Sequence, residues 1–371
     1  MHSNSGKSFF GLMITGGLLA CLAGGLYFAY YALMPAKVGL DRPEDNIIIL
    51  VKKGQSGREI ATFLASKNIV SSGRKFLMIG KFLGKENSIR VGEYQVSPTM
   101  TPMKIWSVIT SGVSLSHPIT VREGENMYEI ADDIESKGLG TKKEFLQLCK
   151  SRVLMQKLDF KEPYPVSLEG YLFPETYFFN RSMSAEEMIK QMVKKFQSVW
   201  TPELAKRAED MRLTKHQVVT LASIVEKETG APSERPLISS VFHNRLNKKM
   251  RLQSDPTTIY GIWEQYKGNL HRKDLHTPTP FNTYTVAALP LGPISNPGRE
   301  AIRAALFPAQ SDFLYFVSHN DGTHQFSKTF AEHNNAVIKF QKDPNARKGK
   351  SWRDLKKNKS QAPASKRRQS S

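Results

Sequence analysis

The spacing of apolar residues along this chain changes period, and each change predicts a different kind of element. The amino end carries an apolar run from Phe9 to Met34 that contains no charged residue. A run of this length is enough to cross a bilayer as one helix, and tyrosines gather at its end, as aromatic side chains do at a membrane–water interface. We therefore predict an uncleaved transmembrane anchor at 9–34, behind a short cytoplasmic head at 1–8.

A cleaved signal peptide is the competing interpretation of this run. Its apolar core would be shorter and would precede a cleavage site of small residues, which Leu33-Met34-Pro35-Ala36 does not resemble. Lys7 and Lys37 lie on opposite sides of the run, so charge alone leaves its orientation open. The short head before a single anchor favours a large part that lies outside the cytosol.

Two later segments, seventy residues apart, repeat one pattern of an alternating strand, a glycine turn and an amphipathic helix. The first runs from Ile49 through Gly54 to Leu64, and the second from Ile119 through Gly124 to Ile134. Repetition in register predicts an internal duplication. Each copy is followed by a further helical patch and a tyrosine-bearing strand, at 76–82 and 92–96 in the first copy and at 145–155 and 170–174 in the second.

This strand-turn-helix pattern, with valine before glycine and Ile-Ala in the helix, resembles the LysM family of glycan-binding modules. The resemblance implies two small α+β units, the first at 35–115 and the second, with a connector, at 116–200. It also implies glycan binding. The alternative is a duplicated scaffold that only positions a catalytic part, because a fold does not by itself imply a function.

A third pattern predicts a helix that carries an acid on its apolar side. Thr214 and Gln217 have the spacing of a capping box, and Gly230 lies where a helix should stop. Glu226 lies seven residues after Val219 and therefore shares its buried face. A carboxyl held in apolar surroundings has a raised pKa, as a general acid requires. The competing interpretation is a helix glutamate that reaches partly into water.

The carboxyl half, 201–341, predicts an α+β domain with a small antiparallel sheet. A helix is expected over 241–246, another begins at Pro256, and a buried strand at 313–318 pairs with 324–327. Long irregular loops join these elements, and their neutral polar side chains suit a sugar-binding groove. The candidate groove residues are Gln253, Asp255, Asn282 and Tyr284.

Three of these residues have a competing structural interpretation. Asp255 can cap the helix that begins at Pro256, and Gln253 can brace a loop instead of binding substrate. Tyr284 can equally be a core residue.

Charge and cysteine content add little to this picture. The formal net charge is +19, and the segment 342–371 alone holds eleven Lys or Arg, which predicts a disordered basic tail. A solubilising tail is the favoured interpretation, ahead of attraction to anionic lipid or wall polymer, and no nucleic-acid motif accompanies it. Of two cysteines, Cys21 lies in the anchor, so Cys149 has no disulfide partner in the exported part. No zinc motif is present, and we predict no metal and no cofactor.

The carboxyl half contains a series of separated motifs in a fixed order. They are Leu221–Thr229, Glu234-Arg235, Asn244-Arg245-Leu246, Met250–Thr257, Tyr284, Pro290–Pro293, Asn296-Pro297-Gly298 and Tyr315-Phe316-Val317. Taken together, these motifs resemble the MltG (YceG-like) family of membrane-anchored endolytic murein transglycosylases. The resemblance extends from about Phe9 to about Phe340.

The resemblance implies that Glu226 is the catalytic acid of a lyase that cuts MurNAc–GlcNAc bonds in nascent glycan strands, leaves 1,6-anhydro-MurNAc ends and helps to terminate strand elongation. It also implies a bacterial inner (plasma) membrane protein, single-pass, with its catalytic part in the periplasm or otherwise outside the cytosol. Peptidoglycan strands and synthases (penicillin-binding proteins) are the implied partners, and nucleic acid is not one.

Two other functions compete with this interpretation. A hydrolytic muramidase needs a second carboxylate, for which Asp255 is the best candidate. A non-catalytic, membrane-tethered scaffold would use only the duplicated units to bind the wall.

Overall fold

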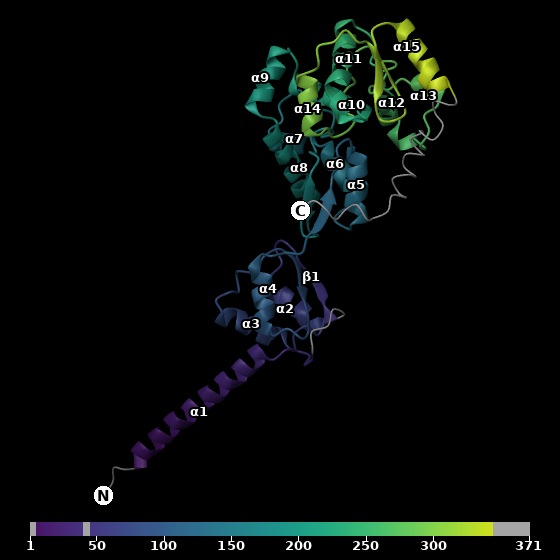
Figure 1. Cartoon of the computed structure of the whole chain (residues 1–371). Helices are drawn as coiled ribbons and strands as arrows, with labels where there is room; N and C mark the ends of the chain where they lie inside the picture. Colours follow the sequence, from purple (N-terminus) through teal and green to yellow (C-terminus); the bar gives the residue numbers. More distant parts are fainter. Residues whose placement is uncertain (1–4, 40–44, 344–371) are drawn as a thin grey trace. The chain divides into compact units, whose positions relative to one another are not determined.

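The computed structural model describes residues 5–39 and 45–343 of the chain (Figure 1). Contacts between residues divide the chain into two compact units, and each unit is formed by two separate segments of the sequence. Unit 1 comprises Met1–Pro118 and Phe178–Ser184, and unit 2 comprises Ile119–Tyr177 and Ala185–Ser371. Most of the predicted basic tail, from residue 344 onward, and the first four residues of the predicted head lie outside the described residues.

The apolar amino end forms a single helix, α1, Ser5–Leu33. Its segment Leu12–Leu33 spans 22 residues and is long and apolar enough to cross a membrane. None of the most apolar part of this helix is buried within the protein. The predicted long apolar helix is therefore confirmed, and its exposed side chains are consistent with a single-pass anchor.

The rest of unit 1 is a small α+β module. A two-stranded antiparallel sheet pairs Ile47 with Val96 and Val51 with Gly92. Side-chain caps begin the helices, as in the capping box that Ser56 forms with Glu59. The elements are β1 Ile47–Val51, α2 Gly57–Ser66, α3 Gly73–Phe82, β2 Gly92–Val96 and α4 Pro102–Ser111.

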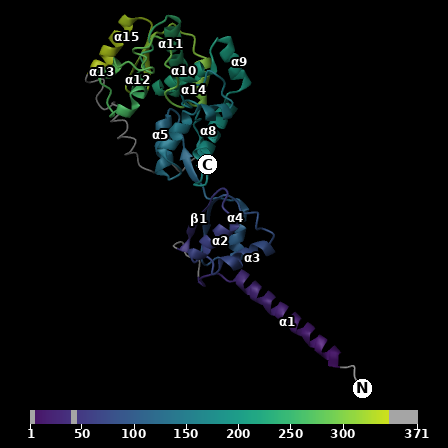
Figure 2. The same ribbon diagram turned by 180° about the vertical axis from the view of Figure 1, so that it is seen from behind.

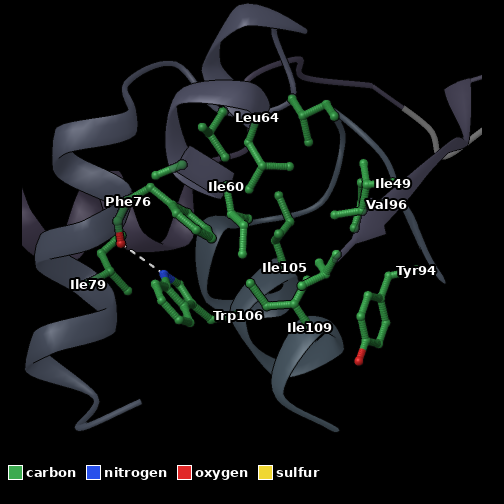
Figure 3. Close-up of a cluster of buried hydrophobic side chains, with 14 of the residues drawn as sticks. Ile49, Ile60, Leu64, Phe76, Ile79, Tyr94, Val96, Ile105, Trp106 and Ile109 are labelled. Atoms are coloured by element: carbon green, nitrogen blue, oxygen red, sulfur yellow. Dashed lines mark hydrogen bonds between the residues drawn. The ribbon is translucent and has the colours of Figure 1, made fainter. Parts of the chain in front are cut away.

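Trp106 belongs to the hydrophobic core of unit 1 and lies beside Phe76 and Ile79 (Figure 3). Its ring is fully buried and stacks on Phe76 of α3, with the ring centroids 4.8 Å apart. Its indole Nε1 donates a hydrogen bond to the Phe76 carbonyl at 2.8 Å, so the polar atom of the ring is satisfied. Gly80 lets α3 approach this closely, because a Cβ there would lie 2.1 Å from the indole ring. Trp106 therefore locks α4 onto α3.

A buried carboxylate joins distant parts of the unit 1 sequence. The side chain of Glu93 is 1% exposed and accepts hydrogen bonds from the backbone N–H and the guanidinium of Arg181. His117 Nε2 lies 2.8 Å from the other carboxylate oxygen. A buried charge needs such partners, so Glu93 ties the segment 178–184 into unit 1.

The second copy of the predicted duplication repeats the element order of the first. Its glycine turn is present, since Gly124 has φ +80°, as Gly54 has φ +81° in the first copy. The predicted helical patch at 145–155 is two helices, separated at Ser151, which caps the second. The elements are β3 His117–Thr120, α5 Met127–Ser136, α6 Lys142–Cys149, α7 Arg152–Lys157 and β4 Thr176–Phe179, and β3 pairs with β4.

The strand predicted at 170–174 is wrong, because the strand begins only at Thr176. The backbone N–H groups of Gly170 and Leu172 donate to the side-chain oxygen of Asn296 and so are not available to a sheet ladder. Pro174 also lacks an N–H group. Both copies run from a strand through a glycine turn and helices to a second strand, with one more helix in the second copy. The internal duplication, its LysM-like identity and the predicted domain boundaries stay predictions.

The remainder of unit 2 is mostly helical around α10 (Figure 2). Helix α10 packs against α14 and α11, and both views show these three helices together. The hairpin predicted near the carboxyl end is confirmed, with Tyr315 paired to Ser327. The elements are α8 Ala185–Val199, α9 Pro202–Asp210, α10 Lys215–Glu228, α11 Arg235–Asn247, α12 Asp255–Gly261, α13 Arg272–Leu275, α14 Arg299–Leu306, β5 Tyr315–Ser318, β6 His324–Ser327 and α15 Phe330–Val337.

Candidate active site

The helix predicted to carry the catalytic acid is present with its predicted ends. Helix α10 begins at a capping box between Thr214 and Gln217 and ends at Glu228. Eight consecutive residues, Val218 to Val225, are buried, so α10 is surrounded by protein on every side. Gly230 follows, and a Cβ there would lie 2.3 Å from the carbonyl oxygen of Gly322, so the hairpin turn passes directly over the helix end.

Glu226 lies inside unit 2 in a buried ion pair. Its carboxylate is 3.1 Å from the Arg235 guanidinium and also accepts the backbone N–H of Gly298 at 3.0 Å. Its side chain is 7% exposed, so it is buried as predicted, but its partners are polar and not apolar. Burial raises the pKa of Glu226 above its ordinary value, while the Gly298 N–H and the Arg235 charge oppose that rise.

Glu228 lies on the other side of α10, in a pocket of about 300 Å³. Its carboxylate accepts a hydrogen bond from the Ser254 hydroxyl at 2.6 Å. Burial raises the pKa of Glu228 to about 7, and the nearby charge of Asp255 adds to the effect, whereas Ser254 and Arg245 oppose it. This carboxyl is therefore half protonated near neutral pH, as suits a group that must give and take a proton.

Three of the four predicted groove residues, Gln253, Asp255 and Tyr284, line this same pocket. Tyr284 donates a hydrogen bond to Asp255 at 2.6 Å, so its hydroxyl lies at the pocket and not in the core. Asp255 occupies the first turn of α12, whose N-cap residue is Ser254, so the alternative that Asp255 caps this helix is wrong. Gln253 has φ +50°, an uncommon backbone conformation for a residue other than glycine.

Arg245 holds the loop that carries Gln253 in place. Its guanidinium donates to the carbonyls of Leu252 and Leu314 at 2.8 and 2.7 Å, and it lies over the ring of Tyr315. Because these bonds join α11, the loop before α12 and the start of β5, the pocket wall is braced by one cation. A planar guanidinium suits such simultaneous bonds better than an ammonium does.

Asn282, the fourth predicted groove residue, lies beneath the pocket, with no exposed surface. Its side-chain oxygen accepts from the Thr258 hydroxyl and from the Tyr284 N–H. Its amide nitrogen donates to the carbonyls of Leu275 and Thr277. These bonds satisfy the amide and make Asn282 a brace for the loop that carries Tyr284, whereas direct contact with substrate stays a prediction.

Replacing Asn282 by Ala should therefore lower stability more than it alters substrate binding. The change leaves several buried donors and acceptors unpaired, which we expect to lower the free energy of unfolding by about 2–3 kcal/mol. Chemical denaturation of the variant measures this loss. A variant of unchanged stability that binds glycan more weakly would instead place Asn282 in contact with substrate.

The sequence pattern does not predict three of the residues at this site, Glu228, Arg245 and His333. Glu228 lies nine residues after Val219, so on a helix with one buried face it turns away from that face. His333 also lines the pocket, and its buried Nδ1 has no hydrogen-bond partner among the described residues. Burial lowers the pKa of His333, and the nearby charge of Arg245 adds to the effect, so the site favours the neutral ring. Hydrophobic patterning carries no signal for these residues, because the pocket is built from segments far apart in sequence.

Comparison with known proteins places these features in a family. The sequence pattern of the YceG-like family matches residues 49–339. A protein of Bacillus subtilis (strain 168) named endolytic murein transglycosylase is 33% identical over 308 residues, which cover 80% of this chain and 85% of that protein. A protein of the same name from Streptococcus pneumoniae (strain D39) is 27% identical, and the match covers 81% of this chain and 59% of the longer relative.

Among solved structures, the crystal structure of a YceG-like protein from Listeria monocytogenes is similar to this chain. The TM-score is 0.55 at 32% sequence identity, and the match covers 79% of this chain and 99% of that one.

Proposed function

This chain belongs to the YceG-like family, and from that premise we propose that it is a peptidoglycan lytic transglycosylase that cuts within glycan strands. The names of the similar proteins, endolytic murein transglycosylase, support the reaction. The observation that carries the proposal is the carboxyl of Glu228, which has a pKa of about 7 and lies in a pocket that also presents Gln253 and Tyr284.

One carboxyl in this state is sufficient for the proposed reaction. Glu228, protonated at the start, gives its proton to the oxygen between N-acetylmuramic acid and N-acetylglucosamine as that bond breaks. The resulting carboxylate then takes the proton of the muramyl 6-hydroxyl as that oxygen bonds to the anomeric carbon. The products are a free hydroxyl on the leaving sugar and a 1,6-anhydro end, and Glu228 is again protonated. The reaction consumes no water and requires no second carboxylate.

The pocket offers neutral groups for holding the sugar. We propose that Gln253 and Tyr284 hydrogen-bond the glycan, and that Asp255 orients the Tyr284 hydroxyl while accepting from a sugar hydroxyl. His333 supplies a further ring nitrogen that has no protein partner among the described residues. A buried polar atom without a partner is unfavourable, so a substrate hydroxyl at His333 would gain binding energy.

Glu226, the acid predicted from sequence, is the alternative proposal for the catalytic group. Its pKa is also raised. The geometry favours Glu228, because both Glu226 oxygens are already engaged, one with Arg235 and the other with the Gly298 N–H. An acid must have an oxygen within reach of the leaving group.

The product ends test the reaction itself. Purified peptidoglycan is incubated with the full-length protein in detergent, and the fragments are analysed by mass spectrometry. Ends of 1,6-anhydro-muramic acid are expected. Reducing muramic ends would show a hydrolytic muramidase, with Asp255 as the second carboxylate, and glycan binding without new ends would show a wall-binding scaffold.

The α1 helix supports a cellular placement for this activity. We propose that α1 anchors the protein by one pass in the bacterial plasma membrane, with unit 2 outside the cytosol. An anchored enzyme would meet strands as they are made, so it would help to terminate their elongation beside the peptidoglycan synthases. Cross-linking of the protein to a synthase in living cells tests that last step.

The pH dependence of cleavage should follow the ionisation of the Glu228 carboxyl. Because its carboxyl must be protonated at the start, kcat/KM should fall as the pH rises through about 7. Asp255→Asn removes a neighbouring negative charge, so the pKa of Glu228 falls and the descending limb moves to lower pH. Ser254→Ala removes a hydrogen bond that favours the carboxylate, so the limb moves to higher pH. Each shift should be roughly one pH unit, measured on a soluble glycan substrate.

The two variants control for one another because they displace the limb in opposite directions. Asparagine at 255 can still accept the Tyr284 hydroxyl, so the pocket keeps that bond. A hydrolytic pair, which needs a second and ionised carboxylate, would add an ascending limb on the acid side. Shifts of one sign in both variants would remove Glu228 as the group that sets the profile.

A further inference from the structure

The α3 helix of unit 1 exposes an unusual combination of side chains. Met78 and Phe82 are 61% and 77% exposed, although both are large and apolar. Arg74 and Lys81 are exposed beside them at helical spacing, so the four residues share one side of the helix, which we call the α3 face. Large apolar groups among cations are typical of helices that lie in a membrane–water interface.

The carboxyl end of α1 packs against this same helix. The ring of Phe28 contacts the ring of Phe82, with centroids 5.3 Å apart. The ammonium of Lys75 hydrogen-bonds the Tyr27 hydroxyl and lies 4.9 Å from the centroid of the Tyr31 ring. Tyr31 in turn donates to the Ser72 carbonyl, just before α3 begins. These contacts place α3 against the last turns of the apolar helix.

If α1 spans a bilayer, this packing determines how close α3 lies to the lipid headgroups. The apolar segment ends at Leu33, and aromatic residues near such an end lie at the level of the lipid headgroups. Phe82 contacts Phe28, five residues before that end, so it reaches the same level. The segment from Ser72 to Ser88 carries four Lys or Arg and one Glu, which complements an anionic headgroup layer.

We propose that the α3 face docks on an anionic lipid surface, with Met78 and Phe82 inserted at the headgroup level and Arg74 and Lys81 on lipid phosphates. The proposal rests on the proposed anchoring by α1 and is independent of the chemistry in unit 2. Docking would hold unit 1 against the bilayer from which new glycan strands emerge.

Depth-dependent fluorescence quenching tests the proposal on the full-length protein. Cys21→Ser removes the exposed native thiol, whereas Cys149 is buried and is left in place. Single cysteines introduced by Phe82→Cys, Val113→Cys or Leu19→Cys carry an environment-sensitive fluorophore. Each protein is reconstituted without other proteins into vesicles of mixed zwitterionic and anionic lipid that contain a spin label in the headgroup or in the acyl chain.

Val113 is the matched control for Phe82. It is 79% exposed, against 77% for Phe82, and it belongs to the same unit. It follows the carboxyl end of α4, and Pro98, which precedes the other end of that helix, hydrogen-bonds Lys37 just beyond α1. The ten residues of α4 span about 15 Å, so Val113 is separated from the α1 exit by the length of the helix.

The expected result is headgroup quenching at position 82, little quenching at 113 and acyl-chain quenching at 19. Equal quenching at 82 and 113, with 19 still quenched by the acyl-chain label, would overturn the docking and leave the anchor standing. Absence of quenching at 19 would overturn the anchor and the docking together. Neither result bears on cleavage, which is measured separately.

Charge reversal separates lipid binding from simple proximity. Lys81→Glu should shift the ratio of docked to undocked protein by roughly fivefold or more, seen as reduced headgroup quenching at position 82. Lys137→Glu, at a lysine that is also exposed and lies at the end of α5 in unit 2, should leave that quenching unchanged. Equal effects of the two reversals would contradict a specific role for the α3 face.

Discussion

Cleavage of peptidoglycan should fall by about 10³-fold when Glu228 is replaced by Gln, with the fold unchanged. The amide keeps the size of the side chain and can still accept the Ser254 hydroxyl, but it can neither give nor take a proton. In the proposed reaction the same group acts in both halves, so no other carboxyl compensates. Release of anhydro-ended fragments per unit time, with circular dichroism as the check on folding, measures the effect.

Glu226→Gln is the matched control, two residues away on the same helix. It neutralises one member of a buried ion pair and leaves the Arg235 guanidinium without its countercharge. We expect a loss of about 1–3 kcal/mol in the free energy of unfolding, with cleavage retained within about tenfold below the unfolding transition. A folded Glu226→Gln protein without activity, beside an active Glu228→Gln protein, would return the catalytic role to Glu226.

Replacing Trp106 by Ala should lower the free energy of unfolding of unit 1 by about 3–5 kcal/mol. The substitution removes the largest fully buried side chain of the chain's described part and its stacking on Phe76. It also leaves the Phe76 carbonyl without the indole donor. The residue of α3 that faces the indole is Gly80, which has no side chain. The cavity left by the alanine substitution therefore cannot be filled from that position. Hydrogen exchange of the unit 1 amides measures the loss.

Two further variants serve as an intermediate case and as a control for this result. Trp106→Phe keeps much of the ring and loses the hydrogen bond, so it should fall between the wild type and the alanine variant. Val113→Ala, at an exposed position, should change stability by less than about 0.5 kcal/mol. If Trp106→Ala were as mild as Val113→Ala, the Trp106 cluster would not be the core that stabilises unit 1.

Local elements of this fold could be predicted because their signals are local. The capping box at Thr214 defines where α10 begins, and short strand-like runs predicted both β2 and the hairpin of β5 with β6. The strand expected at 170–174 failed for a reason that lies far away in the sequence. Asn296 takes the hydrogen bonds of Gly170 and Leu172, and no spacing rule near residue 170 reveals that partner.

The site shows the same limit. Gln253, Asp255 and Tyr284 were selected for their polarity in irregular loops, and the structure brings them to one pocket. Glu226 was predicted from a helical face and lies in a buried ion pair outside this pocket, and its catalytic role stays a prediction. Which side of a fully buried helix faces a cavity depends on the packing of α11, α12 and β5, and periodicity along α10 does not encode it.

Unit 1 is formed by two separate segments of the sequence, and this limits when it can fold completely during synthesis. Its last seven residues, Phe178–Ser184, are synthesised only after 119–177, which belong to unit 2. Chains emerge from the ribosome amino end first. Until Arg181 has emerged, the Glu93 carboxylate lacks its guanidinium. Unit 1 can therefore be completed only after part of unit 2 has been synthesised, and a fragment cut at Pro118 would retain this unfinished state permanently.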